Sequence, residues 1–166
     1  MEPQPLPAFI DYFRRLAGAN RALAGRFVHG AAGRILAGSR STLTYPCLWL
    51  ETPSLGFEEK DGTAPLGQRR CAFVVLQKVP TDSYAEQDAG WAEAERIALQ
   101  VISYMLRDRK ARKFSFSLNG KDLEPVATLT MDNEIGWRLE FELSQYAPSV
   151  QYNAADWLAE EGGQAA

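Results

Sequence analysis

The segment from Trp137 to Leu143 alternates strictly between large apolar and polar side chains. Successive side chains of a strand point to opposite faces. This period of two therefore puts the apolar residues on one face and Arg138, Glu140 and Glu142 on the other. Such a strand needs an apolar layer on one side only. The chain is therefore expected to contain a sheet with one covered face and one polar face.

A long helix is expected to supply that cover. From Trp91 to Met105 the apolar residues recur at helical spacing and form one wide stripe. Ser83 followed by Glu86 fits a capping box at the start of this helix. A second helix is predicted near the N-terminus, over 8–28, from apolar residues spaced by three, four and seven.

Four further segments indicate strands or strand-like structure. The run 71–79 is almost continuously apolar and β-branched at its centre, which is typical of a strand buried on both faces. The segment 43–51 predicts a second strand, and Pro46 within it favours an edge or bulged position. The segments 113–118 and 123–131 predict two strands of an antiparallel meander, separated by an Asn-Gly tight-turn signal.

Residues 52–70 differ in composition from their neighbours. They are rich in Gly, Pro and charge, and the segment is longer than most hairpin loops. It predicts a projecting β-arm or loop, and long loops on a compact scaffold tend to carry function.

These elements predict one α+β domain over 1–148. Its sheet is expected to be mixed and mainly antiparallel, with a long helix packed on one face, an N-terminal helix and a protruding β-arm. Residues 149–166 are expected to form a partly disordered C-terminal tail. The apolar runs are too short to span a membrane, and the first residues do not form a targeting segment, so a cytoplasmic protein is expected.

Catalytic, metal-binding and cofactor-binding residues are not predicted. His29 is the only histidine, and it falls at the predicted end of the first helix, where a surface or capping role is favoured. Cys47 and Cys71 are far apart in sequence, so a zinc site lacks ligands. Phosphate-binding and dinucleotide-binding glycine motifs are missing from the sequence. An enzyme whose acids meet only in the fold is therefore the least favoured function class.

The two cysteines both lie in apolar runs. Buried free thiols are the favoured interpretation, because two cysteines in a chain of this length do not make a disulfide framework. A bridge between Cys47 and Cys71 stays open if their strands are neighbours.

The charge of the chain gives it no overall attraction to nucleic acid or anionic lipid, since the formal net charge is −3. A contact with DNA is expected only through one basic cluster, which ends the long helix. A solvated helix end, whose cations complement the helix dipole, is the favoured interpretation of this cluster. It consists of Arg107, Arg109, Lys110, Arg112 and Lys113.

The element order resembles that of the tail terminator family of long-tailed phages and related tail-like particles. Three stretches carry the resemblance: TYPCLWLE from Thr44, CAFVVLQKV from Cys71, and the helix EQDAGWAEAERIALQVISYML from Glu86. A final β-meander completes it, so that it covers 8–146. The segment 30–42 and the tail have no counterpart in the family pattern.

The resemblance implies a non-enzymatic structural protein. Tail terminators form a ring, commonly a hexamer, on the last ring of the tail tube. The ring stops tube growth and offers the face that joins the head or neck. The expected partners are copies of the chain itself and the tail-tube and head–neck proteins, in the cytoplasm during assembly and then in the virion or tail-like particle. A tube subunit, a head–tail connector and a tail completion protein are also compatible.

A ring needs contacts between subunits, and an arm beside a sheet can extend strand pairing to a neighbour. Two groups of residues are the candidate interface: the apolar residues of the arm and the polar face of the last strand. They are Leu55, Phe57, Leu66, Arg138, Glu140 and Glu142. The alternative is a monomeric adaptor domain that uses the arm at 53–70 to hold a peptide or protein.

Overall fold

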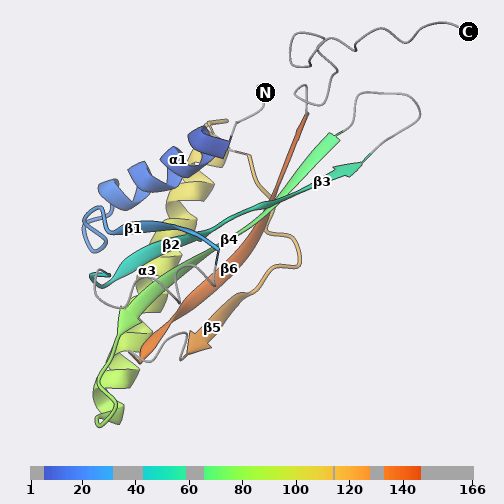
Figure 1. The fold of residues 1–166 in the computed structure, drawn as a ribbon. Helices are drawn as coiled ribbons and strands as arrows, with labels where there is room; N and C mark the ends of the chain where they lie inside the picture. The colour runs from blue at the N-terminus through green and yellow to red at the C-terminus, as the bar shows by residue number, and fades with distance from the viewer. Residues whose placement is uncertain (1–5, 32–42, 59–65, 114, 128–132, 147–166) are drawn as a thin grey trace, which may run out of the picture.

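The computed structural model describes residues 6–31, 43–58, 66–113, 115–127 and 133–146. They form two helices and six strands (Figure 1). In chain order these are α1 (Leu6–Ala19), β1 (Phe27–Gly30), β2 (Cys47–Glu51), β3 (Ser54–Glu58), β4 (Leu66–Lys78), α3 (Tyr84–Lys110), β5 (Leu123–Ala127) and β6 (Glu134–Tyr146). The predicted tail, 149–166, lies outside the described residues.

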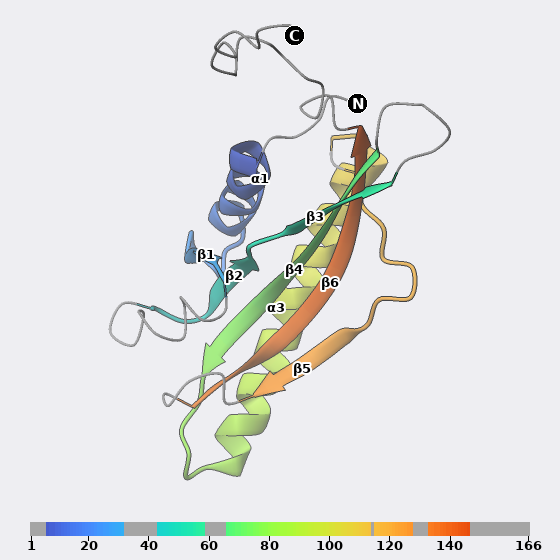
Figure 2. The same ribbon diagram turned by 45° about the vertical axis from the view of Figure 1, so that its right-hand side comes forward.

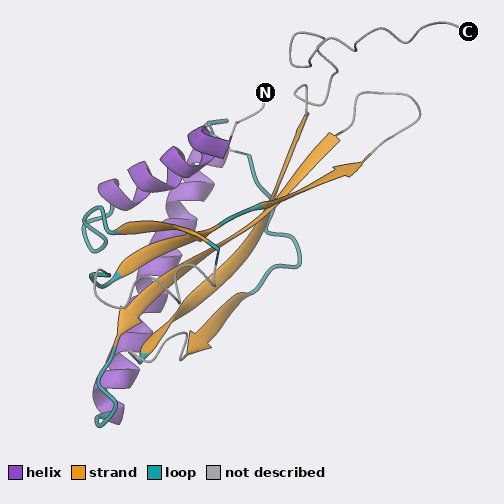
Figure 3. Cartoon of the chain, in the orientation of Figure 1, coloured by secondary structure: helices purple, strands orange, loops and turns teal. Residues whose placement is uncertain are grey.

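The strands form one sheet in the order β1-β2-β4-β6-β5, and β3 pairs with the first part of β4. Only β1 and β2 run parallel. Both helices lie on one face of the sheet, which is called the helix face below (Figure 3). The predicted α+β fold, with a mixed and mainly antiparallel sheet and a helix packed on it, is confirmed. Neither described helix has the length and apolar character needed to cross a membrane.

The central strand β4 is buried on both faces over its second half, as its sequence predicts. Phe73 and Val75 pack under the helices, while Val74 and Leu76 belong to a second apolar cluster on the open face. The strand is longer than predicted, because it begins at Leu66 and pairs along its whole length with β6.

The main core joins the two helices to the sheet. Aromatic rings of α1, β4 and β6 meet there: the ring centroids of Phe13 and Phe141 are 5.6 Å apart, and those of Phe13 and Phe73 are 6.5 Å apart. From α3, the predicted stripe supplies Ile97 and Met105, both fully buried. Each such side chain contributes about 1.5–3 kcal/mol on burial, so this cluster holds both helices on the sheet.

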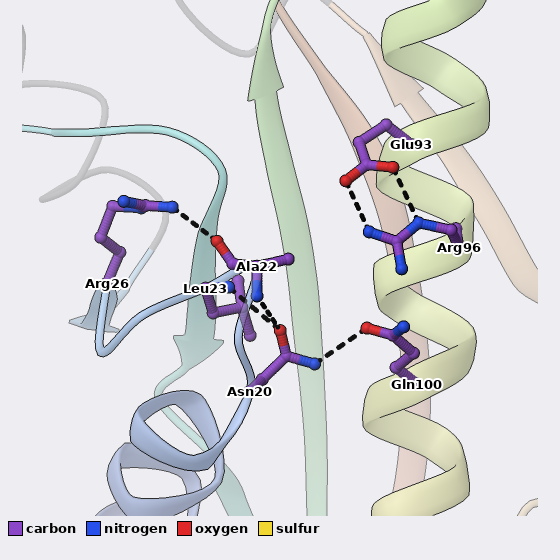
Figure 4. A network of polar contacts seen from close by, with 7 residues as sticks. All are labelled: Asn20, Ala22, Leu23, Arg26, Glu93, Arg96 and Gln100. Atoms are coloured by element: carbon purple, nitrogen blue, oxygen red, sulfur yellow. Dashed lines mark hydrogen bonds and ion pairs between the residues drawn. The ribbon is translucent and has the colours of Figure 1, made fainter.

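The predicted first helix is too long, since α1 ends at Ala19. The side-chain oxygen of Asn20 accepts hydrogen bonds from the backbone N–H groups of Ala22 and Leu23, at 2.9 and 3.0 Å. Its amide group donates to Gln100 of α3 at 3.0 Å (Figure 4). An Asn that bonds the next residues in this way favours a turn over a further helical turn.

After this turn the chain forms β1, where the sequence pattern predicted helix. Gly25 has a φ of +82°, a conformation that glycine adopts without strain. Phe27–Gly30 then pairs with Leu48–Glu51 of β2. His29 therefore lies in an edge strand and not at a helix end.

The prediction that Pro46 marks an edge or bulged strand is wrong. The strand β2 begins at Cys47 and lies inside the sheet, between β1 and β4. Pro46 precedes the paired residues, so its missing N–H leaves the strand pairing intact.

The predicted strand 113–118 is also wrong. Within its described residues, only Ser117 pairs with β6, through mutual backbone hydrogen bonds with Glu142 of 2.8 and 3.3 Å. Phe116 is buried in the core and Leu118 packs against it, so the alternating apolar residues contact the core without forming a strand. The Asn-Gly turn is confirmed, with a φ of +65° at Gly120. It leads into β5, which pairs with the first half of β6.

Gly136 lies where β6 approaches β4 most closely. A Cβ atom at this position would be 2.1 Å from the carbonyl oxygen of Val75. We expect Gly136→Ala to lower the free energy of unfolding by about 3 kcal/mol, because backbone atoms cannot turn away as a side chain can. Urea denaturation measures this value. Gly18→Ala in α1 is the control: its Cβ would meet nothing within 4 Å, so it should stabilise by about 0.5 kcal/mol. Equal effects of the two changes would contradict the close approach.

Candidate interaction surface

The predicted interface residues lie on opposite faces of the sheet. Arg138, Glu140 and Glu142 point to the open face, away from the helices. Leu55 lies directly across from Arg69 and Phe57 across from Gly67, in register with helix-face residues of β4. The sequence therefore predicted two surfaces correctly as polar and apolar, but the fold does not bring them together.

One extra residue between β2 and β3 decides which face the arm shows. Leu50 pairs with Phe73 in β4, whereas Ser54 pairs with Arg70, so one residue around Pro53 is left over. A one-residue shift exchanges the two faces of a strand. Odd-numbered residues face the open side in β2, and they face the helix side in β3.

The arm is defined from here on as β3 with residues 66–70 of β4, and the apolar side chains of β3 are exposed. Leu55 and Phe57 keep 43% and 56% of their surface accessible. In both views β3 points away from α1 (Figures 1 and 2). The apolar side of the sheet thus continues past the cover that the helices provide. Leu66 starts β4, paired with Glu58 and Tyr146, and its side chain lies outside the described part of the chain.

On the open face, Arg138 is held by two carboxylates. Its Nε and Nη2 donate to the two oxygens of Glu51 at 2.7 and 3.1 Å, and its Nη1 donates to Glu140 at 2.7 Å. The two hydrogen bonds to Glu51 make the largest contribution to raising the pKa of Arg138, and the hydrogen bond to Glu140 raises this pKa further. The hydrogen bond from Arg138 lowers the pKa of Glu140. The trio carries one net negative charge.

A second ion pair lies beside this trio. Lys121, which follows the Asn-Gly turn, contacts Glu142 at 3.0 Å. Arg70 lies across the strand pair from Glu142 and is exposed. Together with the trio these side chains border a shallow hollow of about 280 Å³. We call the six residues the charged strip: Glu51, Arg70, Lys121, Arg138, Glu140 and Glu142.

Sequence reasoning found three members of the charged strip and missed Glu51, Arg70 and Lys121. The alternation in β6 marked its own polar face, but the partners come from β2, β4 and the turn before β5. Glu51 is 87 residues from Arg138 in sequence. The sequence offered one indication of a missed member: Glu51 is a polar residue at the end of an apolar run.

The open face also carries an apolar cluster. Cys47, Trp49, Val74 and Leu76 form a buried cluster there, and Tyr45 packs against it. The indole N–H of Trp49 donates to the carbonyl oxygen of Gly30 at 3.0 Å, which ties β1 to β2. The open face therefore has an apolar part over β2 and β4 as well as the charged strip.

The question of a disulfide is settled by the strand register. Cys47 lies opposite Leu76, on the open face, whereas Cys71 lies five residues earlier in β4, on the helix face. Five residues of strand span about 16 Å, well beyond the reach of a disulfide. Both thiols are free and buried, and burial raises the pKa of each to about 12.

Glu134, the first residue of β6, is buried beneath Tyr45. The Tyr45 hydroxyl donates a hydrogen bond to its Oε1, and no ion pair with a cation accompanies it in the described part of the chain. Burial raises the pKa of Glu134, since the apolar surroundings disfavour the charged carboxylate.

Within the described ranges, no three His, Cys, Asp or Glu side chains gather closely enough to hold a metal ion. The arrangement of the arm and the charged strip is suited to binding a surface, through apolar contacts on one side and ion pairs on the other. Models of known protein families and curated protein sequences give no match to this chain.

The two carboxylates around Arg138 should differ in their contribution to stability. Glu51 makes two hydrogen bonds to Arg138 and is 26% exposed, whereas Glu140 makes one and is 53% exposed. We expect Glu51→Gln to lower the free energy of unfolding by about 1 kcal/mol, and Glu140→Gln by less than about 0.5 kcal/mol. Urea denaturation of both variants tests this, and a larger loss for Glu140→Gln would refute the assignment.

Glu134 should make stability depend on pH. Its pKa in the folded chain lies above the unfolded value, so the folded state binds more protons between the two values. The free energy of unfolding should therefore fall as pH rises through that window, starting near the unfolded pKa of about 4.3. Glu134→Gln keeps an acceptor for Tyr45 and removes the charge. Compared with the wild type, the variant should gain relative stability as the pH is raised from 4 to 7, as followed by thermal unfolding; Glu124→Gln, at an exposed site of β5, serves as the control.

Proposed function

We propose that this chain is a non-enzymatic structural subunit that assembles head to tail into a ring. The proposed role is that of a tail terminator of phage tails and tail-like particles, because the order of helices and strands in this chain resembles that of the tail terminator family. Such a ring would cap the tail tube and join it to the head or neck, assembling in the cytoplasm before it becomes part of the particle.

The exposed apolar pair of the arm is the observation that supports the proposal most directly. Leu55 and Phe57 lie on one side of a strand whose outer edge has no partner among the described residues. An open edge strand with apolar side chains and no proline within it offers backbone hydrogen bonds and apolar contacts together. The other long edge, β5, contains Pro125, which removes an amide donor and discourages strand addition.

The charged strip supplies the second half of such a contact. Its acids and bases are mostly paired within the subunit, so it has little unbalanced charge with which to bind a partner strongly. Charges of this kind contribute to orientation and selectivity more than to affinity. Arg70 and the exposed carboxylate Glu140 are the members best placed to meet a neighbour.

The asymmetry of the surface supports head-to-tail assembly. The arm is formed at one end of the sheet, and the opposite end has no similar projection among the described residues. A contact between two different surfaces repeats from copy to copy, and it closes into a ring when the rotation per subunit allows.

The arm is tested by placing charge on it. In light scattering after size exclusion, the wild type is expected to form a closed oligomer of about six subunits over a wide concentration range. Leu55→Lys with Phe57→Lys should give a folded monomer, because two ammonium groups would have to be buried in the contact. Leu99→Lys is the matched control, since Leu99 is 52% exposed on the outer surface of α3. It should assemble like the wild type.

Unchanged assembly of the arm variant would refute the arm as the contact. The rival role, a monomeric adaptor that holds a peptide at the arm, predicts the mass of a single subunit for all three proteins. A wild-type monomer at every concentration would favour the adaptor.

A further inference from the structure

The packing of α1 against the end of α3 creates a basic surface on the helix side of the sheet, whereas the charged strip lies on the open face. The hydroxyl of Tyr12 donates to Asp108 at 3.2 Å, and both groups are buried. This bond brings Arg15 of α1 to the same hollow as Lys113 of the cluster 107–113, whereas Arg14 lies over the ring of Phe27, 5.7 Å from its centroid. Together, α1 and this cluster contain seven cations and only two carboxylates, Asp11 and Asp108, in a chain whose net charge is −3.

Both carboxylates already have partners. Asp11 is paired with Arg14 on the surface of α1. Asp108 accepts hydrogen bonds from Arg107 at 2.9 and 3.1 Å as well as from Tyr12. Each of the two acids is therefore already paired with an arginine of its own, Asp11 with Arg14 and Asp108 with Arg107.

Two members of the predicted cluster are used by the fold itself. Arg107 lies 3.9 Å over the ring of Tyr104, in addition to its contact with Asp108. Arg109 lies 5.1 Å over the ring of Phe116 and donates to its carbonyl oxygen at 3.4 Å. These two arginines contact groups of the fold at the end of α3, while their side chains stay exposed.

Four cations are left without a carboxylate partner among the described residues: Arg15, Lys110, Arg112 and Lys113. Arg15 and Lys113 line one hollow of about 380 Å³ between the two helices, together with Tyr12, Tyr104 and Arg107. The two paired carboxylates, Asp11 and Asp108, line the same hollow. A hollow of this kind, with two free cations and occupied acids, suits a phosphate group. Lys110 and Arg112 are exposed next to it and extend the positive surface beyond a single phosphate.

We infer that this surface binds the phosphate backbone of a nucleic acid, with one phosphate held between Arg15 and Lys113. The inference is independent of ring formation. Contacts of this type carry no sequence preference and depend strongly on salt, because each neutralised phosphate releases bound cations.

The test is fluorescence anisotropy with a labelled DNA duplex of about 30 base pairs in about 50 mM NaCl. The wild type should bind, and Arg15→Glu with Lys113→Glu should raise the Kd at least about tenfold and reduce the salt slope by about 2. Arg15→Lys with Lys113→Arg keeps both charges and should retain binding. The control, Arg21→Glu with Lys78→Glu, changes the net charge equally at exposed sites away from this hollow, and it should bind like the wild type.

Three outcomes would overturn the inference: no binding by the wild type, equal weakening by the control, or competition by poly-glutamate as effective as by unlabelled DNA. The last would assign the surface to an acidic protein. Circular dichroism and thermal unfolding show whether each variant is folded. If Arg15→Glu with Lys113→Glu does not fold, the charge-conserving variant and the wild type still test whether the surface binds DNA.

Discussion

The pairing of β4 on both of its edges is the constraint on which the rest of the fold depends. Its thirteen residues pair with β6 along one edge and with β2 and then β3 along the other. Cys71, Phe73 and Val75 enter the core beneath the helices, and the alternate residues Ala72, Val74 and Leu76 are buried on the open face. A shift of β4 by one residue would exchange these two sets. The helices, the charged strip and the arm all take their positions from this one register.

The extra residue after β2 determines on which face of the sheet the apolar side chains of the arm lie. With the pairing of β2 continued unchanged, Leu55 and Phe57 would lie on the open face, among the charges. The shift at Pro53 puts them on the apolar side instead, beyond the helices. A single inserted residue therefore separates an apolar surface from a polar one at the same end of the sheet.

The sequence predicted those elements whose pattern is local and complete. The alternation in β6 and the stripe of α3 have few other ways to bury their apolar residues, and the structure places them as expected. The first helix was overextended because Leu23 continues its apolar spacing. What ends the helix is the turn in which Asn20 accepts hydrogen bonds from the N–H groups of Ala22 and Leu23, and the same Asn20 side chain also contacts Gln100, 80 residues away. The candidate site was predicted only in part. The alternation within β6 indicated its polar face, but Glu51 and Lys121 become partners of that face only through the pairing of distant strands.

Charge has two separate roles in this chain. In the charged strip, cations and carboxylates are interleaved and largely neutralise each other, so their field falls off within a short distance. At the junction of α1 and α3 the acids are used up by the fold, and the remaining cations produce a field of one sign, which acts over a longer range. Arg69 of the arm lies 5.9 Å over the ring of Phe9 in α1, so the arm begins next to this basic surface. If arms join neighbouring subunits, each contact fixes one basic surface beside it, and a ring would repeat that surface once per subunit. Binding of a polyanion would then rise steeply on assembly, because several weak phosphate sites would act on the same backbone.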